Sequence, residues 1–183
     1  MLLTPTLAFE REYLGSGLFH LGPSSALFRT EVFRELGGFT ESGVASDYVF
    51  WIRACARVNV LLVPGDLFYY RIHPDQEYAN PRNDVEYARS MGTAWAMLNS
   101  AECPLDAAER EQAKTNFVFS SARGAFRHLK QHRSGSAAAI VKYAGPGILD
   151  WMRYLRPPRR RATAGTPVDH ESTRLVMADE KIS

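Results

Sequence analysis

An apolar run over residues 58–64 constrains the fold of this chain more than any other feature. It reads Val58-Asn59-Val60-Leu61-Leu62-Val63-Pro64, and its length and β-branched valines are typical of a buried strand. Residues 67–73 form a second apolar run, which ends before Pro74 because proline cannot donate to a strand ladder. Residues 24–29 also resemble a strand. The sequence therefore predicts an α/β fold over its first 80 or so residues.

Helix signals occupy the rest of the chain. Thr30 can cap a short helix that stops at Gly37-Gly38, since glycine suits the left-handed residue that follows a helix. Ser46 can cap a second helix with Asp47 at its first position. We expect three further helical segments: one capped by Asp84 that runs toward Asn99, one capped by Asp106 that ends near Gly135, and one from Ser136 to Tyr154 that is interrupted at Gly145-Pro146-Gly147.

Composition and charge divide the 183 residues into three parts. Residues 1–82 form the α/β region, residues 83–156 a helical extension, and residues 157–183 a disordered basic and polar tail. The formal net charge of +2 demands no nucleic-acid partner. The two cysteines have no zinc-site spacing, and no apolar segment reaches the roughly 20 residues that span a bilayer. These features favour a reduced, cytoplasmic location.

Three residues between 47 and 73 can each be explained in two ways. Asp47 is either an ordinary carboxylate stabilised by the helix dipole or a base that accepts a proton from a substrate hydroxyl. His73 is either a surface residue or a neutral imidazole that binds a divalent cation, although one histidine is not a metal site. Trp51 is either a core residue or part of a stacking platform for a substrate. Arg53 and Arg71 are better explained as partners of buried carbonyls or of Asp47 than as phosphate ligands.

Over residues 15–78 the chain resembles the second half of a family 2 glycosyltransferase, an inverting nucleotide-sugar enzyme with the GT-A, Rossmann-like fold. Four segments carry the resemblance: Gly22 to Arg29, Val32 to Phe39 with its Gly37-Gly38-Phe39 turn, Ser46-Asp47-Tyr48 through Arg53, and Tyr70-Arg71-Ile72-His73. The resemblance implies a partial GT-A-like mixed sheet in which Asp47 is the general base that deprotonates the acceptor hydroxyl. It also implies that His73 contacts the metal or the diphosphate, and that Trp51, Ser24 and Arg71 bind substrate.

Two departures from the family pattern limit what the resemblance implies. Ser46 stands where many members carry Glu, and the chain contains no D-x-D carboxylate pair. A complete enzyme needs such a pair to hold Mn²⁺ or Mg²⁺ on the leaving diphosphate. The chain therefore resembles an acceptor-side half whose partners are a nucleotide-sugar donor and a hydroxyl acceptor, either a glycan or a lipid-linked molecule. The cation belongs to the complete enzyme, this chain alone need not bind one, and a second chain could supply the missing half.

Two other interpretations remain open. Residues 84–155 could dock on another protein, so that the chain is a non-catalytic helical interaction module on a degenerate transferase scaffold. Residues 148–161 combine apolar side chains with five arginines, a pattern that predicts peripheral contact with the inner face of a membrane.

Overall fold

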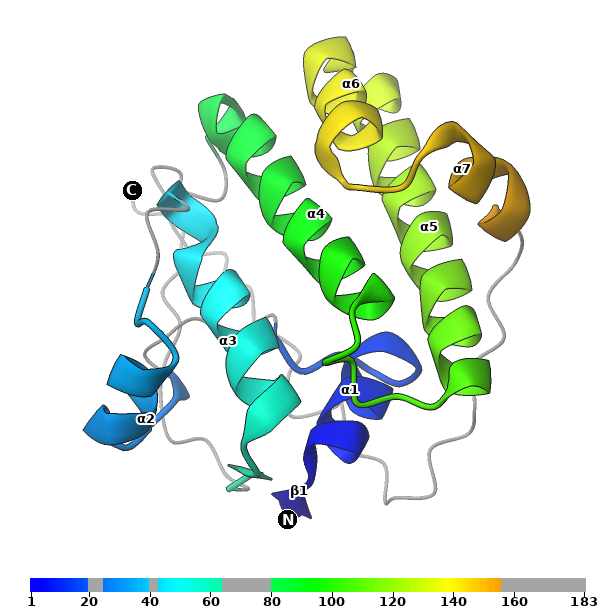
Figure 1. Ribbon diagram of the computed structural model, residues 1–183. Helices are drawn as coiled ribbons and strands as arrows, with labels where there is room; N and C mark the ends of the chain where they lie inside the picture. Colours follow the sequence, from blue (N-terminus) through cyan, green and yellow to red (C-terminus); the bar gives the residue numbers. More distant parts are fainter. Residues whose placement is uncertain (20–24, 40–42, 64–79, 156–183) are drawn as a thin grey trace, which may run out of the picture.

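The computed structural model describes residues 1–19, 25–39, 43–63 and 80–155, and 69% of these residues are helical (Figure 1). None of the helices in these ranges is long and apolar enough to cross a membrane. The elements, in chain order, are β1 (Leu2–Leu3), α1 (Pro5–Tyr13), α2 (Thr30–Glu35), the 3₁₀ turn η2 (Gly43–Ala45), α3 (Ser46–Arg57), β2 (Val60–Leu61), the 3₁₀ turn η4 (Pro81–Asn83), α4 (Asp84–Asn99), α5 (Ala107–Lys130), α6 (Ser134–Tyr143) and α7 (Ile148–Tyr154).

Helices α3, α4 and α5 form the body of the molecule (Figure 1). Helices α3 and α4 run in the same direction, and α5 returns antiparallel to α4. Helix α1 packs against α3 and α5, while α6 packs on both α4 and α5. The first residues of α3, α4 and α6 therefore lie toward one end of the molecule, at the top of Figure 1.

The predicted mixed sheet is wrong for the part of the chain that the structure describes. Its one sheet pairs β1 with β2 in antiparallel register, Leu2 opposite Leu61 and Leu3 opposite Val60. In the described part of the apolar run 58–64, Val60 and Leu61 pair with β1, and Leu62 exchanges main-chain hydrogen bonds with Met1. Leu61 remains 66% exposed. Residues 25–29 form no strand, and the run 67–73 lies outside the described residues. The part of the chain that the structure describes is thus helical with a minimal sheet, and it is not a Rossmann-like α/β fold.

The helices predicted from caps and breakers are found. Helix α4 spans Asp84–Asn99 with Asn83 at the cap position, and α2 spans Thr30–Glu35 with Arg29 there, so the caps predicted at Asp84 and Thr30 are each wrong by one residue. Asp106 caps α5 as expected: its carboxylate accepts a hydrogen bond from the Glu109 amide at 2.8 Å, and the Glu109 carboxylate accepts one from the Asp106 amide at 3.3 Å. The segment after α5 is broken at residues 145–147, where Gly145 has φ 102°. Local signals therefore located most of the helical extension.

The main core draws on nearly every helix. Its largest fully buried side chains include Phe9 of α1, Ile52 of α3, Leu98 of α4 and Val118 of α5. The same cluster reaches Tyr154 in α7, so residues 1–82 and 83–155 share packing, and the division into two regions remains a prediction.

Both cysteines lie in this core as free thiols. Burial, together with the negative charge of Glu12, raises the pKa of the Cys55 thiol to about 12. Since the thiolate is the reactive form, Cys55 is a packing residue and not a nucleophile at neutral pH.

Candidate functional site at the start of helix α3

Asp47 lies in the first turn of α3, where its side chain is half-buried. Its Oδ1 accepts a hydrogen bond from the Tyr48 amide at 2.7 Å, one of the amides that a helix start leaves without a helical partner. Ala45, and not Ser46, occupies the cap position, and no side chain caps this helix. The predicted cap is therefore wrong by one residue, because η2 runs directly into α3.

The turn that precedes Asp47 in the chain is held by a contact that the sequence did not suggest. The Glu86 carboxylate of α4 accepts a hydrogen bond from the Val44 amide of η2 at 3.1 Å. Gly43, with φ 65°, lies so close to the Glu86 carboxylate that a Cβ atom at this position would overlap Glu86 Oε2. The only sequence signals were an isolated glycine and an acidic residue in the first turn of α4. Glu86 of α4 thus holds η2, the turn that leads directly into the helix that carries Asp47.

Trp51 follows Asp47 by one helical turn, so both lie on the same side of α3. Its half-buried ring packs edge-on against Phe50, with centroids 5.3 Å apart, and against Phe28 at 5.9 Å. Phe33 and Phe39 complete this aromatic cluster through contacts with Phe50. Trp51 is therefore a packing residue in the described structure, and its role in an acceptor wall remains a prediction.

Arg53 connects α3 to the glycine turn that ends α2. Its Nη1 donates to the Leu36 carbonyl and its Nη2 to the Gly38 carbonyl, each at 2.7 Å. Gly37 and Gly38 have φ 79° and 61°, the left-handed region in which glycine is favoured. The interpretation of Arg53 as a partner of main-chain carbonyls is thus confirmed, and so is the helix stop at Gly37-Gly38.

Replacing Arg53 with Lys is expected to lower the free energy of unfolding by about 1.5 kcal/mol, because an ammonium cannot hold both carbonyls in the geometry of the planar guanidinium. Urea denaturation measures this change. Arg57→Lys, on the same helix, is the matched control: Arg57 is half-exposed and pairs with the exposed Glu102 at 3.0 Å, so its loss should cost less than about 0.5 kcal/mol. Equal losses for the two variants would contradict the proposed importance of the two carbonyl contacts.

The other predicted site residues, Ser24, Arg71 and His73, lie outside the described residues. Their convergence with Asp47 and Trp51 remains a prediction. Within the described ranges, no group of three or more His, Cys, Asp or Glu side chains could hold a metal ion.

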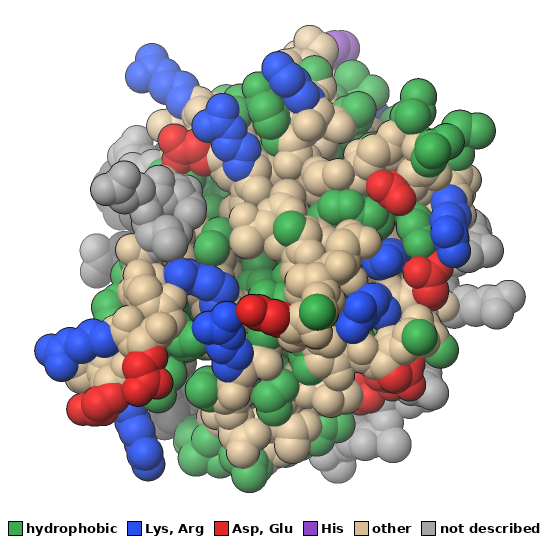
Figure 2. All heavy atoms as spheres, in the orientation of Figure 1, with side chains coloured by type: hydrophobic (Ala, Val, Ile, Leu, Met, Phe, Trp, Pro, Cys, Tyr) green, Lys and Arg blue, Asp and Glu red, His purple; other side chains and the backbone are tan. Residues whose placement is uncertain are grey.

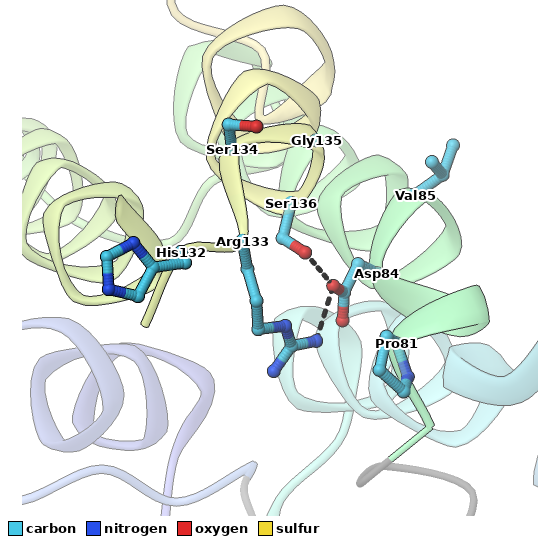
Figure 3. Close-up of a pocket in the computed structure, with 8 residues that line it drawn as sticks. All are labelled: Pro81, Asp84, Val85, His132, Arg133, Ser134, Gly135 and Ser136. Carbon is cyan, nitrogen blue, oxygen red and sulfur yellow. Dashed lines mark hydrogen bonds and ion pairs between the residues drawn. The ribbon is translucent and has the colours of Figure 1, made fainter. Parts of the chain in front are cut away.

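A hollow of about 350 Å³ lies between the starts of α4 and α6 (Figure 3). Asp84 lines this hollow, and its Oδ2 accepts hydrogen bonds from two other lining residues, from the Arg133 guanidinium at 2.6 Å and from the Ser136 hydroxyl. The side chains of His132 and Ser134 point away from this carboxylate (Figure 3). Because the Asp84 charge is already paired with a cation, the cluster fastens α6 to α4 and offers no free acid.

Comparisons of the chain with protein-family models, with curated proteins and with solved structures found no match.

Proposed function

We propose that this chain is the acceptor-side part of an inverting nucleotide-sugar glycosyltransferase, with Asp47 as the general base. The observation that supports it best is the pair of hydrogen bonds from Arg53. They join two of the segments that carry the family resemblance, the Gly37-Gly38-Phe39 turn and the helix from Ser46 to Arg53. The two segments are thus one structural unit, and Asp47 lies in the first turn of the helix that belongs to it.

In the proposed reaction, Asp47 accepts the proton of the acceptor hydroxyl while that oxygen attacks the anomeric carbon of the donor. The bond between the anomeric carbon and the diphosphate oxygen breaks at the same time. The nucleoside diphosphate leaves with the electron pair, and attack from the opposite face inverts the anomeric centre. The half-buried position of Asp47 suits this role, because the residue is partly shielded from bulk water and partly accessible to an acceptor.

The donor side of the reaction requires residues beyond those described. The chain has no D-x-D pair, so binding of the nucleotide and of a divalent cation is assigned to the complete enzyme, with His73 as the residue of this chain proposed to contribute.

The test is sugar transfer by the chain fused to a nucleotide-binding half of the same enzyme family. We expect release of nucleoside diphosphate from a UDP- or GDP-sugar when glycan or lipid-linked hydroxyl acceptors are added with MnCl₂. The matched control is the same fusion without residues 1–63, which should release no more than its background hydrolysis. Equal release by the two fusions would overturn the proposal.

One finding favours a second function, that of a helical protein-interaction module: helices dominate the described residues, and the sheet is minimal. Calorimetric titration of the fusion with UDP- and GDP-sugars and Mn²⁺ separates the two functions. Metal-dependent heat supports the transferase, whereas no heat, together with a stoichiometric protein partner, supports the module.

A further inference from the structure

The outer side of helix α5 carries hydrophobic and basic side chains together along its last two turns. Phe126 and Leu129 are 58% and 53% exposed, and Arg123, Arg127 and Lys130 are exposed around them. At about 100° per residue, these five side chains fall within one sector of about 160° of the helix. A surface helix normally turns its hydrophobic side chains toward the core and its charges toward water. These five residues, the α5 stripe, combine both kinds of side chain on the outside.

The α5 stripe does not result from a loosely attached helix. On the opposite side of α5, Val118, Ser121 and Ala125 are buried. Helix α6 packs closely on this buried side, since a Cβ atom at Gly124 would lie 3.6 Å from Ile140 Cδ1. The core therefore fixes the rotation of α5 and holds the α5 stripe outward.

The positive charge of the α5 stripe is not neutralised by carboxylates in the part of the chain that the structure describes. No Asp or Glu occurs from residue 112 to residue 149, a stretch that contains six Lys and Arg residues. Two of these six form ion pairs with carboxylates of α4 and α5, but none of the three cations of the stripe does so among the described residues. The helix dipole favours cations in the last turn of α5, which accounts for Arg127 and Lys130. It accounts neither for Arg123 nor for the two exposed hydrophobic side chains.

The end of the molecule that carries the α5 stripe is basic beyond the stripe itself. Because α5 runs antiparallel to α4, its last turns lie at the same end of the molecule as the start of α4 (Figure 1). Arg82 of η4 and Arg89 of α4 are both exposed at this end. Figure 2 shows Lys and Arg side chains on the surface at the upper end of the molecule, over α6 and the start of α4. Two acids of α4 at this end, Asp84 and Glu86, already accept hydrogen bonds from other groups of the protein.

The composition of the α5 stripe favours an anionic membrane as its partner. The Lys130 ammonium lies 4.9 Å from the centroid of the Phe126 ring, so the cation and the ring form one exposed unit. A lipid bilayer offers anionic headgroups directly above an apolar layer, and a helix that lies in this boundary needs cations and large hydrophobic side chains on the same side. Nucleic acid would attract the three cations, but its phosphate backbone offers no apolar layer for Leu129.

We propose that the α5 stripe binds the surface of a membrane that contains anionic lipid. Phe126 and Leu129 enter the boundary between headgroups and acyl chains, and the three cations of the stripe contact lipid phosphates. The binding is peripheral and does not depend on whether Asp47 is catalytic. It is also separate from the membrane contact predicted for residues 148–161, of which 156–161 lie outside the described residues.

Flotation of the full chain with lipid vesicles tests the proposal. The chain should float with vesicles of phosphatidylcholine and phosphatidylglycerol, and at least about tenfold less with phosphatidylcholine alone. The variant Arg123→Gln/Arg127→Gln/Lys130→Gln should lower partitioning into the anionic vesicles by on the order of a hundredfold. The variant Phe126→Ser/Leu129→Ser should lower it by about tenfold, because it removes the side chains that enter the apolar layer. Both variants should keep their helical circular dichroism, since all the replaced side chains are exposed.

Each variant has a matched control outside α5. Arg29→Gln/Arg34→Gln/Arg57→Gln removes three exposed cations and changes the net charge by the same amount, and Leu27→Ser/Leu61→Ser removes two exposed leucines. Both controls should float like the unaltered chain. Equal losses for the charge variant and its control would overturn the proposal, because net charge and not the α5 stripe would then drive the binding.

Three further results would also overturn the proposal. The first is failure of the unaltered chain to float, and the second is flotation of both stripe variants at the level of the unaltered chain. The third is binding to single-stranded RNA that is tighter than binding to the anionic vesicles and is lost in the charge variant, because nucleic acid would then be the partner of the α5 stripe.

Discussion

Asp47→Asn is expected to lower the rate of sugar transfer by the complete enzyme by about 10²–10⁴-fold, the usual contribution of a general base. Asparagine has nearly the same shape as aspartate, and its Oδ1 can still accept the 2.7 Å hydrogen bond from the Tyr48 amide. The substitution therefore removes proton acceptance and leaves the start of α3 in place. The expected loss appears in kcat, while the KM for the acceptor changes little, since the amide occupies the same space.

The same variant separates catalysis from stability. Loss of the charge from the first turn of α3 should lower the free energy of unfolding by no more than about 1 kcal/mol. Asp106→Asn is the matched control, because Asp106 also lies at a helix start and asparagine caps a helix as well as aspartate does. We expect unchanged transfer for this control. Transfer within tenfold of the unaltered enzyme for Asp47→Asn would remove Asp47 as the base.

Features with local causes could be predicted from the sequence. Asp106 and the Gly145-Pro146-Gly147 breaker act within one or two turns, and both function as expected. The apolar run 58–64 failed as a predictor of a sheet because a strand depends on partners elsewhere in the chain. Its only described partner is the two-residue strand Leu2–Leu3.

In the candidate site, too, the features with local causes were predicted and the contacts between distant residues were not. The stop at Gly37-Gly38 follows from local backbone preference, and Arg53 was correctly assigned to main-chain carbonyls. Glu86, which holds the turn before Asp47, was missed because it lies 42 residues from its partner Val44 in the sequence. The Arg133 bond to Asp84 spans 49 residues and was equally unpredictable. Local rules locate the ends of the helices, but they do not identify which side chain of another helix will hold them.

Close packing of α4 against α6 leads to a second large effect, at Gly92. A Cβ atom at this position would lie 2.6 Å from the carbonyl oxygen of Tyr143, near the end of α6. That atom belongs to the backbone, so no side-chain rotation relieves the overlap, and the two helices must separate. Overpacking of this kind lowers the free energy of unfolding by about 3 kcal/mol, whereas the higher helix propensity of alanine raises it by about 1 kcal/mol. Gly92→Ala should therefore lower the free energy of unfolding by about 2 kcal/mol.

Gly124→Ala in α5 provides the control with the same chemical change. Its added Cβ would meet only Ile140 Cδ1, at 3.6 Å, an ordinary van der Waals contact. Only the helix-propensity gain remains, so this variant should be more stable by up to about 1 kcal/mol. The two substitutions should thus differ by about 3 kcal/mol in urea denaturation, with opposite signs relative to the unaltered chain. If Gly92→Ala were stabilising to the same degree as Gly124→Ala, helices α4 and α6 could not approach as closely as 2.6 Å implies, and the packing that places Asp84 against Arg133 would need revision.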